Sequence, residues 1–124
     1  MTRARVIDRM LELWNGGDLA VIAEIYAPEY VEEVREEIVQ LRQAFPDQRF
    51  DVERELVADG TVVLCLRWHG THRGPFASPL GVIEPTGRRF SIRGIEIFDV
   101  RDDRVVGTRM AWDLASLVVQ LRGD

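Results

Sequence analysis

The first third of the chain repeats apolar residues at the three- and four-residue spacing of amphipathic helices. The first such stripe predicts a helix over about residues 3 to 14, which ends at Asn15-Gly16-Gly17 because glycine adopts the left-handed cap conformation at little cost. Asp18 is expected to cap a second, short helix that ends at Pro28, and a third helix is expected over about residues 31 to 44.

After Pro46-Asp47 the apolar period changes from 3.6 residues to 2, which indicates strands. Phe50, Val52 and Leu56 alternate with charged residues and predict a half-exposed strand. Asp59-Gly60 is typical of a hairpin turn.

The following strand, Thr61 to His69, contains an uninterrupted apolar run from Val62 to Leu66, which favours burial on both faces. A long loop over about residues 73 to 87 separates it from strands expected at Arg89 to Val100 and Val105 to Trp112. Leu114 to Leu121 forms either a terminal helix or an extension of the last strand.

Helices followed by strands predict an α+β fold, in which N-terminal helices cover one face of an antiparallel sheet of about four strands. We expect residues 1–124 to form a single domain. Because the second sheet face also carries apolar residues, we expect a homodimer or a tetramer that forms through this outer face.

Composition narrows the classes of partner. The chain has 124 residues and a net charge of −5, which argues against nucleic acid and anionic membranes as partners, because both select clustered positive charge. A single cysteine, Cys65, allows no intrachain disulfide, and with only two histidines we expect no metal site. The N-terminus lacks the apolar stretch of a secretion signal, and no apolar run approaches the length of a membrane span, so we expect a cytoplasmic protein.

Several short motifs occur in a characteristic order. They are Phe45-Pro46-Asp47, Trp68 to Phe76, Pro85 to Arg89, Ile95 to Phe98, and Trp112-Asp113 ahead of Gln120-Leu121. In this order the chain resembles the SnoaL-like family of polyketide and ester cyclases, within the nuclear transport factor 2-like superfamily. The resemblance implies a cone-shaped α+β barrel, in which a strongly curved sheet wraps around helices and a pocket opens at the wide end. It also implies a chemistry, ring closure of a polyketide ester by an intramolecular aldol step, although relatives include isomerases, hydrolases and binding domains.

The resemblance implies that Asp113 is the general acid/base. Burial beside Trp112 and Leu114 would penalise the ionised carboxylate and raise its pKa toward neutrality, where it could take and return a proton. The alternative is structural, because an aspartate ahead of Leu-Ala-Ser is a good N-cap for the terminal helix. The two roles are compatible.

His72 is the second catalytic candidate, because histidine titrates near neutrality and can donate to an enolate oxygen. Strand alternation places it on one face with Trp68 and Gly70, whereas His69 is expected on the outer face. Alternatively, His72 holds the long loop by a hydrogen bond to a backbone carbonyl.

The remaining candidates would bind substrate. Five aromatic residues either line an apolar pocket or belong to the core: Trp14, Tyr26, Phe45, Trp68 and Phe76. Glu96 is either a second pocket carboxylate or a partner of Arg93 or Arg109. Arg109 either pairs with Asp113, which would lower the pKa of that carboxyl, or binds an acidic substrate group. The acidic run Glu32 to Glu37 is interpreted as a solvated helix face.

The sequence departs from the family pattern at two places. Val31 runs directly into Glu32, without the loop that commonly covers the pocket mouth in relatives, so we expect a more open pocket. Arg109 stands where the family frequently has an aromatic residue.

Our first hypothesis is therefore a small, cofactor-free enzyme that acts on an apolar carbonyl compound by proton transfer, with ring closure as its reaction and isomerisation or hydrolysis as variants. The alternatives are a non-catalytic dimeric module that binds a hydrophobic ligand, and a pure dimerisation domain.

Overall fold

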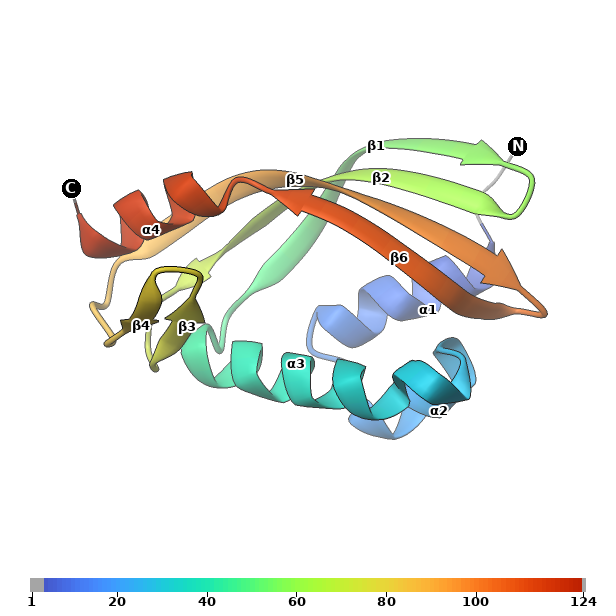
Figure 1. The fold of residues 1–124 in the computed structure, drawn as a ribbon, viewed down its shortest axis with the longest axis horizontal. Helices are drawn as coiled ribbons and strands as arrows, with labels where there is room; N and C mark the ends of the chain where they lie inside the picture. The colour runs from blue at the N-terminus through green and yellow to red at the C-terminus, as the bar shows by residue number, and fades with distance from the viewer. Residues whose placement is uncertain (1–3, 124) are drawn as a thin grey trace.

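The computed structural model describes residues 4–123, and in it the helices precede the main sheet (Figure 1). The N-terminal helices are α1 (Arg5–Trp14), the 3₁₀ turn η1 (Leu19–Val21), α2 (Ile22–Ile25), the 3₁₀ turn η2 (Pro28–Tyr30) and α3 (Val31–Ala44). Asp18 caps η1 as predicted, because its carboxylate accepts a hydrogen bond of 2.9 Å from the Ala20 N–H.

Four antiparallel strands form the sheet, in the order β1-β2-β5-β6. They are β1 (Arg49–Ala58), β2 (Thr61–Thr71), β5 (Arg89–Arg101) and β6 (Arg104–Trp112). The loop expected over residues 73 to 87 contains a small hairpin of β3 (Phe76–Ser78) and β4 (Gly81–Ile83), and the chain then closes with helix α4 (Leu114–Arg122). The predicted α+β class is confirmed, with N-terminal helices on one face of a four-stranded antiparallel sheet.

Strand β2 is buried on one face only, which corrects the expectation of burial on both. Its even-numbered residues from Val62 to Trp68 are buried, whereas the odd-numbered residues between them are half-exposed. The outer face also carries charge, because the Glu53 carboxylate lies 3.3 Å from Arg67 and 3.1 Å from Arg93. The expected association through this face stays a prediction.

Strand β1 contains a bulge that changes which residues face inward. The register with β2 shifts between Val52 and Arg54, so the simple alternation expected from Phe50 to Leu56 breaks. Phe50 remains buried, whereas Leu56 is 53% exposed.

The core consists of two clusters, one at each end of the arched sheet. One lies under the N-terminal helices and includes Ile7, Leu13 and Leu64, and the other surrounds Phe45 near α4. Figure 1 shows the sheet arching over α1 and α3, with α4 and the β3–β4 hairpin at one end. None of the helices within residues 4–123 is both long enough and apolar enough to cross a membrane.

Candidate functional site

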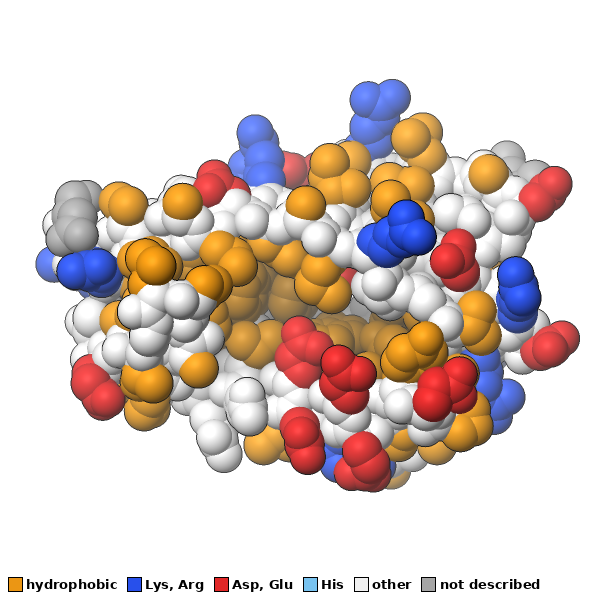
Figure 2. All heavy atoms as spheres, viewed as in Figure 1, with side chains coloured by type: hydrophobic (Ala, Val, Ile, Leu, Met, Phe, Trp, Pro, Cys, Tyr) orange, Lys and Arg blue, Asp and Glu red, His pale blue; other side chains and the backbone are white. Residues whose placement is uncertain are grey.

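A cavity of about 900 Å³ lies between helix α3 and the concave face of the sheet. Its walls come from α1, η2, α3, the β3–β4 hairpin, strands β1, β2, β5 and β6, and the start of α4. Figure 2 shows the hollow with apolar walls and acidic side chains along its lower rim. Cavities that hold small organic molecules are about 300–1,000 Å³ in volume, so this one can enclose such a molecule.

Aromatic rings make up much of the cavity wall. Phe50 and Trp68 stack with ring centroids 5.5 Å apart, and Trp112 meets Trp68 edge to face at 5.7 Å. Trp14 approaches Phe50 edge to face at 5.9 Å. Rings held against one another in this way form a rigid apolar surface suited to a flat ligand.

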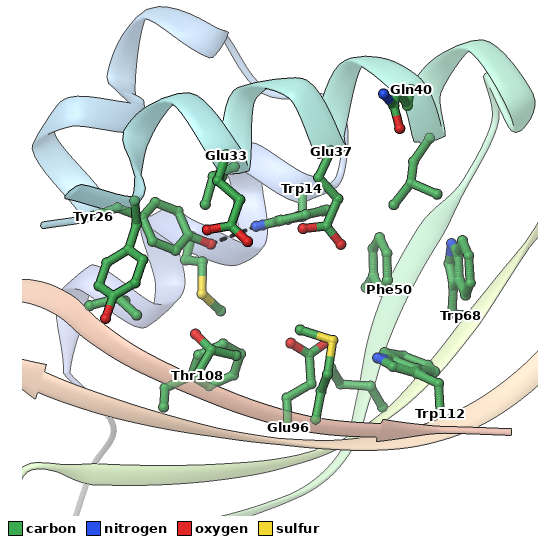
Figure 3. A pocket seen from close by; sticks show the side chains of 18 of the residues that line it. Trp14, Tyr26, Glu33, Glu37, Gln40, Phe50, Trp68, Glu96, Thr108 and Trp112 are labelled. Carbon is green, nitrogen blue, oxygen red and sulfur yellow. Dashed lines mark hydrogen bonds between the residues drawn. The ribbon is translucent and has the colours of Figure 1, made fainter. Parts of the chain in front are cut away.

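Glu96 projects into the cavity from the central strand β5 (Figure 3). It is partly buried, and burial together with the negative charge of Glu37 raises its pKa to about 7, although a hydrogen bond from the Trp112 side chain acts in the opposite direction. Trp112 reaches this position because it faces Gly94 across strands β5 and β6, where a Cβ atom would overlap the indole. The strand pair thus holds a carboxyl group that exchanges its proton near neutral pH.

Helix α3 brings two more carboxylates to the same cavity. Glu33 and Glu37 are four residues apart, so they lie on one face of the helix and line the mouth opposite Glu96 (Figure 3). The loss of solvent around the Glu37 carboxyl group, and the negative charge of the neighbouring Glu33, raise the pKa of Glu37. The interpretation of Glu32 to Glu37 as a purely solvated face is therefore incomplete.

Tyr26 supplies a hydroxyl group at the end of the cavity near α1. It is 5% exposed, and its oxygen accepts a 2.7 Å hydrogen bond from the Trp14 indole N–H. Burial raises the pKa of Tyr26, with smaller contributions from the charges of Glu96 and Glu37. The hydroxyl therefore stays protonated, and since this bond uses it as an acceptor, its own hydrogen can be donated to a ligand.

Six of the residues proposed from the sequence line the cavity: Trp14, Tyr26, Trp68, Phe76, Glu96 and Arg109. Phe45 does not line the cavity and belongs instead to the core, the alternative given for these aromatic residues. It is fully buried among other rings, with centroids 4.7 Å from Phe90 and 5.1 Å from Phe76, so it supports the wall from behind.

Asp113 is exposed and lies outside the cavity lining, so its predicted burial is wrong. Strand β6 ends at Trp112, and the Asp113 carboxylate accepts a 3.1 Å hydrogen bond from the Ser116 N–H at the start of α4. The capping role is thus confirmed. A catalytic role for Asp113 stays a prediction, and the burial from which it was argued is not found.

His72 is completely buried, beside Phe45 and away from the cavity lining. Its Nδ1 accepts a 3.3 Å hydrogen bond from the Thr86 N–H and lies 3.1 Å from the Thr86 hydroxyl. Burial lowers the pKa of His72, which favours the neutral ring. These contacts fit the alternative in which His72 holds the long loop, and its catalytic role stays a prediction.

Arg109 and Glu96 do not pair with each other. Arg109 is exposed on the edge strand β6, and the ion pairs formed within residues 4–123 do not include it. Arg93 contacts Glu53 rather than Glu96, and His69 lies on the outer face as expected, with Nε2 2.8 Å from Asp51.

Sequence reasoning missed four lining residues that matter for the site: Glu33, Glu37, Phe50 and Trp112. The spacing of Glu33 and Glu37 could have indicated a shared helix face, adjacent to the apolar stripe of Val34 and Ile38. In the part of the chain that the structure describes, no group of three or more histidine, cysteine or acidic residues is placed to hold a metal ion.

Comparison with known proteins adds a family and a fold. Residues 4–121 match the family model of SnoaL-like polyketide cyclases. Among solved structures, TsrD from Streptomyces laurentii is similar at 25% identity and a TM-score of 0.84, covering 97% of this chain and 98% of its own. IdmH from Streptomyces antibioticus, a proposed polyketide cyclase, is similar at 24% identity and a TM-score of 0.80, covering 94% of this chain and 96% of its own. Among curated proteins, none matches this chain.

Proposed function

Because the chain belongs to the SnoaL-like polyketide cyclase family, we propose that it is a small enzyme that closes a ring on an apolar carbonyl compound by proton transfer. The observation that carries this proposal is the carboxyl group of Glu96, which projects into an aromatic cavity. Its pKa is raised to about 7 by burial and by the negative charge of Glu37. An acid/base group is most effective when its pKa lies near the working pH.

The proposed reaction needs a substrate with two carbonyl groups flanking one carbon and a third carbonyl within reach. The ionised Glu96 carboxylate takes a proton from the activated carbon, and the resulting enolate carbon attacks the third carbonyl to form a carbon–carbon bond. The carbonyl oxygen becomes an alkoxide and takes the proton back from the Glu96 carboxyl group. The product is an isomer of the substrate, and the two flanking carbonyls supply the activation that a cofactor would otherwise provide.

In the proposed reaction Tyr26 stabilises the enolate. It lines the same cavity as Glu96, and its hydroxyl stays neutral and can donate its hydrogen to an enolate oxygen. The Trp14 indole N–H bound to the Tyr26 oxygen strengthens that donor, because hydrogen bonds in a chain polarise one another.

The test compares turnover of the wild-type protein with that of the Glu96→Gln variant on a panel of β-keto esters that can close intramolecularly. We expect kcat to fall about 100-fold or more, because general acid/base catalysis contributes about 10²–10⁴-fold. The wild-type pH–rate profile should rise as Glu96 ionises near its pKa of about 7.

Asp113→Asn is the matched control, because asparagine keeps the helix cap and removes the other candidate carboxylate. We expect this variant to keep its turnover, since Asp113 lies outside the cavity lining. Full activity of Glu96→Gln together with a loss in Asp113→Asn would return the catalytic role to Asp113.

A non-catalytic module that binds a hydrophobic ligand is the second candidate, and the exposure of Asp113 favours it. In that case no member of the panel would react with the wild type or with either variant, while the cavity would still bind apolar ligands.

A further inference from the structure

The charges that face the cavity are strongly one-sided. Glu33 and Glu37 line it from α3, and Glu96 lines it from β5. Among residues 4–123 none of these three carboxylates forms an ion pair. The lining also includes Asp99 and a single basic residue, Arg109, both exposed.

Asp99 adds a further negative charge, and Arg109 does not pair with any of the three carboxylates. The Asp99 carboxylate accepts a 3.2 Å hydrogen bond from the Thr61 hydroxyl, on the neighbouring strand. Arg109 on β6 is paired with Ile97 on β5, whereas Glu96 is paired with Met110. The pKa of Glu96 is set by burial, by the charge of Glu37 and by the hydrogen bond from Trp112. The carboxylates therefore repel one another across a cavity whose one lining cation among the described residues, Arg109, forms an ion pair with none of them.

The aromatic walls are a second and independent feature of the same cavity. The side chains of Trp14, Tyr26, Phe50 and Trp112 surround the space between Glu37 and Glu96 (Figure 3). Faces of aromatic rings attract cations through their quadrupole, and aromatic enclosures are a common way to bind ammonium groups. The acidic rim and the aromatic wall both favour a ligand with a positive charge.

We propose that the ligand of this cavity carries a positively charged nitrogen, as a protonated amine or a cationic heterocycle, on an apolar body. The nitrogen lies between Glu37 and Glu96, and the body lies against the aromatic wall. This inference rests on the proposed use of the cavity as a substrate site, but it does not depend on proton transfer by Glu96.

Such a ligand would also change the state of Glu96. A positive charge between the two helical carboxylates and Glu96 favours the ionised carboxylate, so binding lowers the pKa of Glu96. The occupied site would then hold the base in its proton-accepting form below the pH at which the empty site does.

The experiment measures binding by isothermal titration calorimetry at pH 7.5, using 1-naphthylmethylammonium, 1-naphthylmethanol and 1-naphthoate as probes. The three share one ring system and differ in charge. We expect the ammonium to bind about tenfold tighter than the alcohol and the carboxylate to bind weakest, from the combined attraction of carboxylates and rings. The advantage of the ammonium should shrink with added salt, because Glu33 and Glu37 are solvent-accessible.

The variant Glu33→Gln/Glu37→Gln should lose most of the preference for the ammonium. Glu36→Gln is the matched control, because Glu36 is exposed on the same helix but does not line the cavity. Ammonium binding that is no tighter than alcohol binding, or a preference that survives the double substitution, would overturn the proposal. Neither result bears on the turnover of Glu96→Gln, so the two proposals can fail separately.

Discussion

Glu96 should make the folded protein less stable as the pH rises, and the size of the effect follows from its position. Burial and Glu37 raise its pKa from 4.5 to about 7 in the folded chain. Between these two pH values the folded protein keeps a proton that the unfolded chain has released, so the free energy of unfolding falls as pH increases. One pKa unit corresponds to about 1.4 kcal/mol, which gives a total loss of about 3 kcal/mol.

The measurement is urea denaturation of the wild type and of Glu96→Gln at several pH values from 4.5 to 8. Glutamine has nearly the same shape and its side-chain oxygen can accept the same hydrogen bond from Trp112, but it does not titrate. We expect the two proteins to be similarly stable near pH 4.5, and the variant to gain about 3 kcal/mol over the wild type by pH 8. His72 resists protonation in both proteins, so its contribution below about pH 6.5 cancels in the difference.

The result that would refute this reasoning is a constant difference between the two proteins across the pH range. It would mean that Glu96 ionises as readily inside the cavity as in the unfolded chain. Glu36→Gln provides the control, because removal of an exposed carboxylate outside the cavity should leave the pH dependence unchanged.

Substitutions at Gly94 and Asp113, each with a matched control, test two further contacts, one beside the cavity and one at the start of α4. Gly94→Ala should lower the free energy of unfolding, measured by urea denaturation, by about 1–3 kcal/mol, because the added methyl overlaps the Trp112 indole. It should also lower kcat by turning that indole away from Glu96. In the control Gly107→Ala the added methyl group would meet only the Asp99 side chain, so stability and kcat should change less, and equal effects of the two substitutions would contradict the packing argument. Asp113→Ala should cost about 1 kcal/mol by loss of the helix cap, whereas Asp113→Asn should cost little, and equal losses in the two would argue against a capping role.

The elements of the fold were predictable because each one has a local signal. The apolar stripe and the flanking residues of the third helix predict about residues 31 to 44, and α3 spans Val31–Ala44. The turn at Asp59-Gly60 likewise separates β1 from β2. The hairpin at residues 76–83 was missed, because its strands have only three residues each and show no clear alternation.

The site was less predictable, because periodicity tells which face a residue occupies but not where the two layers separate. Trp14 and Phe45 both belong to apolar stripes, yet only Trp14 lies where the sheet arches away from the helices. Trp112 and Asp113 are adjacent in sequence, but the strand ends between them, so one lines the cavity and the other caps a helix. The acidic pair on α3 has the composition of a solvated surface, and only the sheet opposite makes it part of a cavity.

The chain contains three tryptophans, and Trp14, Trp68 and Trp112 all line the cavity. Ultraviolet emission of this protein therefore originates almost entirely at the walls of one chamber. An occupant that displaces water there would shift the emission to shorter wavelength, and one with an absorbing ring would quench it. The protein thus carries an intrinsic optical indicator of occupancy.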